Sequence, residues 1–103
     1  MIKHIVILQF IPTLSNAEIK AIMDQLSSLK SLIPSIQYFS YGENCSSEQL
    51  NKGFNYAFTM DFLDEVGRNA YLNHPEHIRI AQEVILPVLV NGFESVLVVD
   101  YKF

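Results

Sequence analysis

The sequence is poor in cysteine, tryptophan and charge, and these shortages narrow what the protein can be. Its 103 residues include one cysteine, no tryptophan and 17% charged residues, while 50% are hydrophobic. The lone Cys45 cannot form an intrachain disulfide, which is typical of a reducing compartment and predicts a cytoplasmic protein. The composition is too apolar for a disordered chain, and its low charge indicates that part of the apolar surface meets a partner.

Long apolar runs and basic clusters are also missing. No stretch approaches the roughly 18 apolar residues of a membrane-spanning helix, so no membrane association is expected. Scattered Lys and Arg number 7 against 11 acidic residues, for a net charge of −4. A nucleic-acid partner is not expected, because such binding needs basic side chains on one face. Metal-finger spacings, glycine-rich phosphate loops and nucleophile elbows are absent, and neither a metal nor another cofactor is predicted.

The hydrophobic pattern predicts four strands and three helices. Alternating or β-branched stretches indicate strands at residues 2–10, 36–41, 54–62 and 95–101. Spacings of three and four indicate helices at about residues 16–30, 63–72 and 76–89. A capping box of Ser15 and Glu18 is expected to open the first helix. Pro87 is expected to bend or fray the last helix.

The order of these elements, βαββααβ, predicts a single α+β domain over residues 1–103. It is the order of the ferredoxin-like sandwich, whose four-stranded sheet carries its helices on one face. Alternation places apolar side chains on the second face as well. We assign to that face Ile5, Ile7, Phe39, Tyr41, Leu97, Val99 and Tyr101. An uncovered apolar surface of this size predicts a homodimer in which two sheets pack face to face as a dimeric α/β barrel.

A few polar residues interrupt the face that we assign to the helices, and they are the candidate site residues. His4 and Asp100 each occupy an otherwise apolar strand face, where an unpaired polar group is costly. His77 faces the same core from the last helix, and Tyr71 lies just before the helix break. An imidazole oriented by a carboxylate is a general base, and a tyrosine hydroxyl can donate to a carbonyl or an enolate. Together they predict proton abstraction next to a carbonyl group.

The substrate of such a site is expected to be a small apolar molecule, because the predicted walls of the pocket are hydrophobic. These walls are Leu8, Met23, Leu26, Phe58 and Val84. The alternative is a non-catalytic protein in which His4, Asp100 and His77 form a structural hydrogen-bond network. His74 precedes Pro75 and is expected to fix the helix break rather than to react.

Four segments of the chain resemble the stress-responsive A/B barrel (Dabb) family. They are Ile2-Lys3-His4-Ile5-Val6, Tyr41-Gly42-Glu43-Asn44, Tyr71-Leu72-Asn73-His74-Pro75-Glu76-His77 and Val98-Val99-Asp100-Tyr101. The resemblance covers essentially the whole chain, and the His-Pro-x-His sequence after a tyrosine is its most specific part. It implies two ferredoxin-like subunits joined through their sheets.

The family includes an enzyme, the plant olivetolic acid cyclase, which closes a ring by an aldol condensation without a cofactor. By resemblance, His77 corresponds to the general base and Asp100 to the carboxylate that orients it. Tyr71 corresponds to the tyrosine beside the substrate, and His4 to the pocket histidine. A second tyrosine of the cyclase falls at Leu26 here, which puts the same substrate and product in doubt. The alternatives within this fold are a non-catalytic stress-responsive or ligand-binding dimer and a cofactor-free monooxygenase of aromatic compounds.

Overall fold

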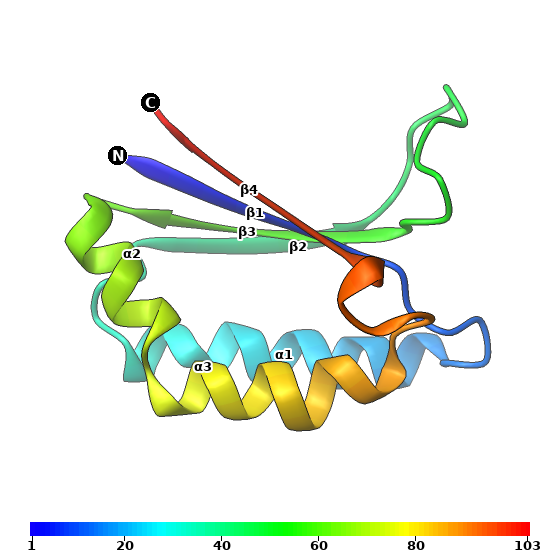
Figure 1. The fold of residues 1–103 in the computed structure, drawn as a ribbon, viewed down its shortest axis with the longest axis horizontal. Coiled ribbons are helices and arrows are strands. Elements are labelled where there is room, and N and C mark those ends of the chain that lie inside the picture. Colours follow the sequence, from blue (N-terminus) through cyan, green and yellow to red (C-terminus); the bar gives the residue numbers. More distant parts are fainter.

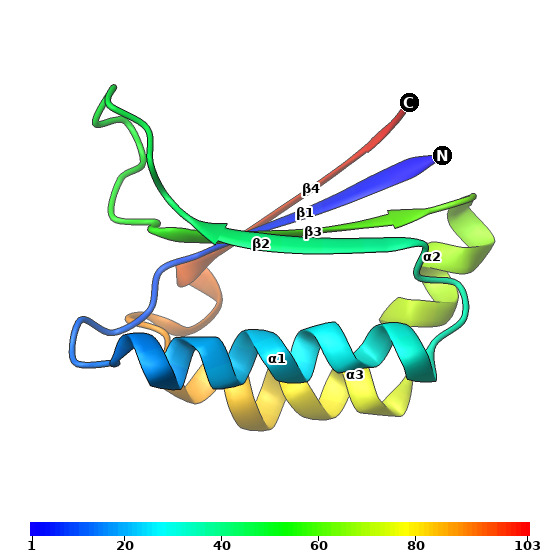
Figure 2. The ribbon, with the colours of Figure 1, turned by 180° about the vertical axis from the view of Figure 1, so that it is seen from behind.

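The computed structural model describes residues 1–103 and shows one antiparallel sheet of four strands in the order β2-β3-β1-β4. The strands are β1 (Ile2–Leu8), β2 (Tyr38–Glu43), β3 (Tyr56–Phe62) and β4 (Val96–Lys102). The helices α1 (Asn16–Leu32), α2 (Glu65–Leu72) and α3 (Pro75–Arg79) all lie on one side of this sheet (Figures 1 and 2). The predicted ferredoxin-like fold is confirmed. No helix combines the length and the apolar character needed to cross a bilayer.

Local side-chain caps start two of the helices where the sequence predicts them. The Ser15 hydroxyl accepts a hydrogen bond from the Glu18 N–H, and the Glu18 carboxylate accepts one from the Ser15 N–H, both at 3.1 Å. At the start of α3, His74 Nδ1 accepts from the Glu76 N–H at 3.1 Å, and Pro75 occupies the first turn. Proline is favoured there because its missing N–H has no intrahelical partner to lose. His74 therefore fixes the break between α2 and α3, as predicted.

The last helical segment differs from the single α-helix that we predicted for residues 76–89. After α3 the chain continues as a π-helix, η1 (Ile80–Ile85), and a 3-10 turn, η2 (Leu86–Val88). Pro87 has no N–H to donate, and in an α-helix its ring would clash with the carbonyl four residues earlier. The wider π turn accommodates this proline, and it changes which side chains of the segment face the sheet.

The strand register corrects one part of the predicted sheet. Phe39 pairs with Met60 and Tyr41 with Phe58, and both partners are buried beneath the helices. Cross-strand partners point to the same face, so our assignment of Phe39 and Tyr41 to the uncovered face is wrong. The Phe39 ring instead lies 5.9 Å from the Phe58 ring. Aromatic residues at positions 38, 39 and 41 leave the phase of this short strand ambiguous in the sequence.

Apolar side chains from the sheet and from α1 fill the space between the two layers. Those with almost no exposed surface include Leu8, Met23, Leu29, Met60 and Phe62. Burying a side chain of this kind stabilises the fold by about 1.5–3 kcal/mol. The core thus supplies a closely packed frame around the site described below.

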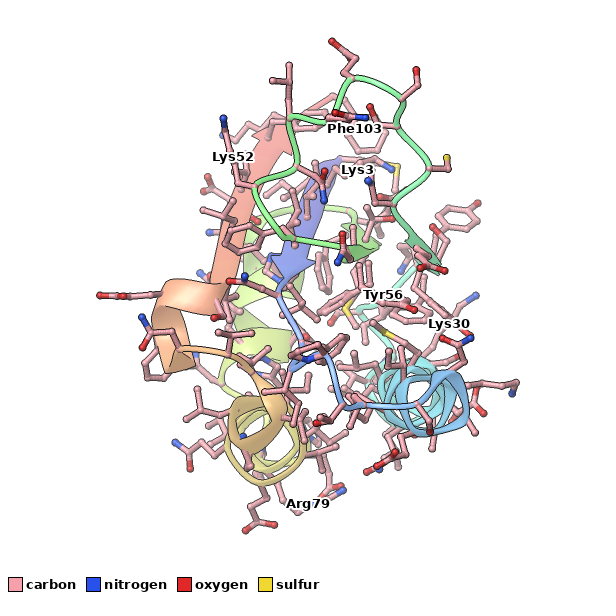
Figure 3. The ribbon with its side chains drawn as sticks, turned by 90° about the vertical axis from the view of Figure 1, so that its right-hand side faces the viewer. Lys3, Lys30, Lys52, Tyr56, Arg79 and Phe103 are labelled. Carbon is pink, nitrogen blue, oxygen red and sulfur yellow. The ribbon has the colours of Figure 1, made fainter.

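The uncovered face of the sheet, called the outer face below, is apolar on β1 and β4. Its pairs Ile5 with Val99 and Ile7 with Leu97 follow the predicted alternation, and Leu97 and Val99 are about half exposed. Residues 44–55 rise on this side as an arm (Figure 1). Lys52 marks the arm in Figure 3, on the side of the molecule opposite Arg79 of α3. The arm and the outer face enclose an open hollow of about 540 Å³.

Candidate functional site

A cavity of about 280 Å³ lies between the sheet and the helices, and three of the four predicted catalytic residues line it. Its walls are His4, Val6, Leu8, Leu26, Phe58, Tyr71, Leu72, His77, Ala81, Ile85, Leu86, Leu89, Phe93, Val96 and Val98. None of these residues is Asp, Glu, Lys or Arg. The cavity is therefore suited to an apolar ligand with few polar contacts.

Two residues that we predicted as walls do not line the cavity. Met23 is completely buried in the core of the domain instead. Val84 lies within the π-helix, where the wider turn brings Ala81 and Ile85 to the cavity in its place. The predicted walls Leu8, Leu26 and Phe58 do lie on the cavity surface.

The hollow on the outer face is larger than this cavity but is a poorer candidate for chemistry. It lies between the arm and the sheet, and its lining contains no histidine. Glu43 and Lys52 are its only charged residues. His4, His77 and the buried Tyr71 meet in the cavity beneath the sheet, which we take as the candidate site.

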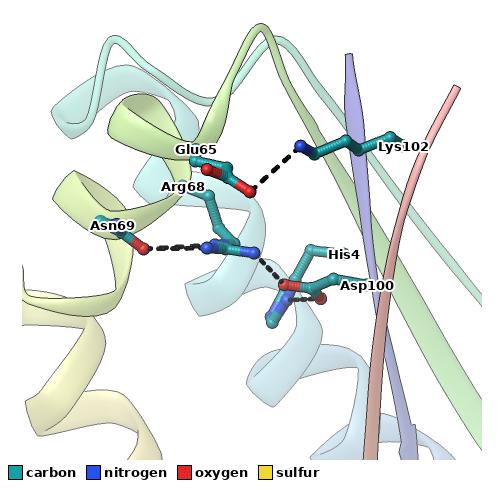
Figure 4. A network of polar contacts seen from close by, with 6 residues as sticks. All are labelled: His4, Glu65, Arg68, Asn69, Asp100 and Lys102. Carbon is teal, nitrogen blue, oxygen red and sulfur yellow. Dashed lines mark hydrogen bonds and ion pairs between the residues drawn. The ribbon is translucent and has the colours of Figure 1, made fainter.

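A chain of polar contacts links His4 to the surface at one side of the cavity (Figure 4). His4 and Asp100 are direct partners across β1 and β4, and His4 Nδ1 lies 2.7 Å from Asp100 Oδ1. The other carboxylate oxygen of Asp100 accepts a hydrogen bond from Arg68 on α2 at 3.1 Å. The His4 side chain is 4% exposed, whereas those of Asp100 and Arg68 are 22% and 23% exposed. The buried His4 imidazole is thus held in place by Asp100, which forms an ion pair with Arg68 at the edge of the site.

His77 has a different partner from the one implied by the resemblance. Its Nδ1 lies 3.0 Å from the carbonyl oxygen of Leu72, and Asp100 makes its hydrogen bonds to His4 and Arg68. The expectation that Asp100 orients His77 is therefore wrong. Asp100 lies opposite His4 in the sheet, so the strand register places this carboxylate beside His4 and not beside His77.

The partners of the two histidines fix where their protons lie. A carboxylate and a carbonyl oxygen only accept hydrogen bonds, so Nδ1 is the donor in both His4 and His77. In the neutral rings Nε2 then carries the lone pair, and neither Nε2 makes a hydrogen bond within the protein. Both atoms are available as proton acceptors, and both residues line the cavity.

Tyr71 lies between the two histidines and is completely buried. Its ring centre lies 4.4 Å from that of His77 and 5.7 Å from that of His4. Burial raises the pKa of its hydroxyl, which therefore stays protonated as a donor. This hydroxyl has no hydrogen-bond partner. We expected Tyr71 to reach in from the rim of the pocket; it instead forms part of the closed interior.

Arg68 is the site residue that our reading of the sequence missed. Residues three apart on a helix share a face, and Arg68 precedes Tyr71 by three on α2. That spacing was the available signal for its position over the sheet. His, Cys, Asp and Glu side chains do not gather in groups of three that could hold a metal ion.

Replacing His77 with Gln is expected to make the free energy of unfolding less dependent on pH below about pH 7. Burial lowers the pKa of the His77 imidazole in the folded protein, whereas the unfolded side chain titrates near about 6.5. Below that pH the unfolded state takes up the proton first, so the native protein loses free energy of unfolding. Glutamine does not titrate but can still donate to the Leu72 carbonyl.

Urea unfolding of both proteins between about pH 8 and pH 5 measures this effect. The stability advantage of the native protein over His77→Gln should shrink steadily as the pH falls. His74→Gln is the control for a histidine in a capping role. A stability difference that stays constant over the whole pH range would contradict a buried, neutral His77.

Comparison with known proteins agrees with this fold over the whole chain. The family model described as Stress responsive A/B Barrel Domain matches residues 2–103. The stress-response A/B barrel domain-containing protein HS1 of Arabidopsis thaliana is 27% identical over 101 residues, which cover 98% of this chain and 88% of that protein.

Two solved structures show the same architecture. A dimeric ferredoxin-like protein of unknown function from Jannaschia sp. CCS1 superposes with a TM-score of 0.87 at 28% identity, covering 99% of this chain and 98% of that one. A hydroxynitrile lyase from Passiflora edulis superposes with a TM-score of 0.83, covering 97% and 90% of the two chains. At 20% identity, the second likeness shows the shared fold alone. On its family match, the chain belongs to the stress-responsive A/B barrel domain family.

Proposed function

We propose that the protein is a cofactor-independent enzyme that abstracts a proton next to the carbonyl group of a small apolar compound. The observation that carries this proposal is the His4 imidazole. Its Nε2 has no partner in the protein and belongs to a residue of the apolar cavity, while its Nδ1 lies 2.7 Å from Asp100. An imidazole in this setting is a general base whose tautomer and orientation are fixed by the carboxylate.

In the proposed step, His4 Nε2 takes the proton from the carbon next to the carbonyl. The electron pair of the broken C–H bond moves into the enolate, and His4 becomes an imidazolium. Asp100 stabilises this cation through the Nδ1–H bond, which grows stronger as charge develops. The proton returns from His4 to carbon or oxygen at the end of the reaction, so neither an oxidant nor a reductant is needed.

Tyr71 and His77 supply the remaining polar groups of the proposed site. An unpartnered buried hydroxyl costs about 1–3 kcal/mol. A small movement of the Tyr71 ring toward the ligand would let its hydroxyl donate to the carbonyl oxygen and to the enolate. Burial lowers the pKa of His77, which favours its neutral form, and its free Nε2 would accept a hydrogen bond from a hydroxyl of the ligand.

The finer proposal is an aldol-type ring closure, as in a polyketide cyclase. An enolate formed at His4 would attack a second carbonyl of the same molecule, and the proton held by the imidazolium would neutralise the new alkoxide. Leu26 lies on the cavity wall and gives that part of the site an apolar surface. A compound with two carbonyl groups on an apolar skeleton is the substrate class that these groups would accept.

Deuterium exchange provides the direct test. The protein is incubated in D₂O with a panel of apolar ketones and 1,3-dicarbonyl compounds, and NMR follows deuterium uptake at the carbon next to the carbonyl. General-base catalysis contributes about 10²- to 10⁴-fold, so the native protein is expected to accelerate exchange of at least one compound by this order. His4→Gln should return the rate to that of the buffer.

The same samples distinguish an enzyme from a binding protein. Compounds that bind, as shown by shifts of the cavity methyl resonances, but exchange no faster than in buffer would favour a non-catalytic ligand-binding protein. The observation that favours this second function is the Tyr71 hydroxyl. It is buried without a hydrogen-bond partner and would have to move to contact a ligand.

We further propose that the protein acts as a homodimer joined through its outer faces. The Jannaschia relative is described as dimeric. Leu97, Val99 and Tyr101 expose 47–55% of their surface side by side on β4, and contiguous exposed apolar side chains of this kind mark protein–protein contact sites. The hollow between the arm and this face would receive part of the second copy.

A further inference from the structure

Two of the side chains that line the cavity are exposed at the protein surface. Of the residues that line it, only Phe93 and Val98 are exposed, by 78% and 56%. Val98 points to the helix-covered side, because it pairs with the buried Val6. β4 is an edge strand of the sheet, and Val98 is exposed although it points to the side of the helices. Phe93 lies in the 3-10 turn η3 (Gly92–Ser95), which precedes β4.

His4 and Phe93 lie toward different ends of the cavity. His4 and Leu8 both line it along β1, and four residues of a strand span about 13 Å. His4 pairs with Asp100 near one end of β4, whereas the Gln9 N–H binds the carbonyl of Ser95, at the end of η3. Phe93 therefore belongs to the end far from His4.

The cavity holds about 280 Å³, near the lower end of the roughly 300–1,000 Å³ usual for ligand pockets, so it can take a small ligand or one end of a longer one. Its open side has no charged lining residue, so the part of a ligand that leaves there should be apolar. A phenylalanine that exposes most of its ring beside such an opening has apolar surface for that part to cover.

We propose that the ligand is an elongated carbonyl compound whose apolar tail leaves the cavity over Val98 and Phe93, and that Phe93 determines the preferred tail length. This inference rests on the proposed function, because it places the carbonyl end beside His4. The continuity of the exposed pair with the cavity wall favours a ligand tail over a second protein as the occupant.

A series of linear 2-alkanones, from hexan-2-one to dodecan-2-one, tests the proposal through their dissociation constants, measured by NMR titration. Each methylene that becomes buried contributes about 0.8 kcal/mol, or about fourfold in affinity. Affinity is expected to rise by up to this factor per carbon along the whole series. In Phe93→Ser the rise should stop at the tail length that fills the enclosed cavity, and Phe93→Leu should be intermediate.

Val66→Ser is the matched control, because Val66 is also 78% exposed but lies on α2 away from the cavity lining. It should leave the whole series unchanged. The same increase per carbon in Phe93→Ser as in the native protein overturns the inference, as does a native protein that gains nothing from longer tails. A Phe93→Ser protein with a changed molecular mass and unchanged affinities would assign this surface to contact between copies instead.

The outcomes separate this inference from the proposed function. Short ketones that bind and exchange deuterium, without any gain from longer tails, would remove the role of Phe93 and leave proton abstraction at His4 intact. Tail-dependent binding without exchange would support the open-ended cavity and remove the catalytic proposal. Failure of every ketone to bind would overturn both.

Discussion

Replacing Asp100 with Asn is expected to slow proton abstraction from a bound ketone by about 10²- to 10⁴-fold, with little change in ketone affinity. The carboxylate accepts the Nδ1–H bond of His4 at 2.7 Å and lies outside the cavity lining, so it does not contact the ligand. An amide can present its NH₂ group to Nδ1, which moves the imidazole proton to Nε2 and removes the base. It also lacks the charge that stabilises the imidazolium.

Asp61→Asn is the matched control for this experiment. Asp61 is also a largely buried strand aspartate in an ion pair, 2.8 Å from Lys3 on the outer face, but it contacts neither histidine. The same substitution there should leave the exchange rate within about twofold of the native rate, because no base loses its partner. Equal losses in the two variants, or an Asp100→Asn protein with the native rate, would remove Asp100 from the proposed mechanism.

The fold was predictable because its signals are local. Strand alternation, helical spacing and the Ser15 cap each depend on residues close in sequence, and the structure contains the predicted elements in the predicted order. The main error concerns a feature that depends on residues distant in the sequence. The phase of β2 follows from its pairing with β3, which places Phe39 in the core. The π-helix before Pro87 was also not predicted, although Pro87 was expected to bend or fray the end of this helix.

The residues of the candidate site were predictable from the sequence, but their hydrogen-bond partners were not. His4 and Asp100 were identifiable as polar residues on an apolar face, and they lie opposite one another in neighbouring strands. The order of strands in the sheet, which places β4 beside β1, was needed to pair them. Family resemblance instead assigned Asp100 to His77, whose imidazole bonds the Leu72 carbonyl. The three-residue spacing from Tyr71 could have indicated which face of α2 carries Arg68, but its contact with Asp100 is seen only in the structure.

Val99→Lys is expected to convert the proposed homodimer to single chains at micromolar concentration. Val99 pairs with Ile5 on the outer face and exposes 55% of its surface. In a face-to-face dimer it would be buried, and an unpaired buried charge costs about 3–5 kcal/mol. Two-fold symmetry places two such lysines in one interface, so the dissociation constant should rise by at least about 10³-fold.

Val98→Lys provides a neighbouring control on the same strand. Val98 is 56% exposed but points to the opposite side of the sheet, so the same added charge lies outside the proposed dimer interface. Light scattering on both proteins should show a mass of one 11.8 kDa chain for Val99→Lys and of two chains for Val98→Lys. A Val99→Lys protein that keeps the mass of two chains would place the contact elsewhere on the surface. Single chains in the native protein would remove the dimer altogether, and the apolar outer face would then need another partner.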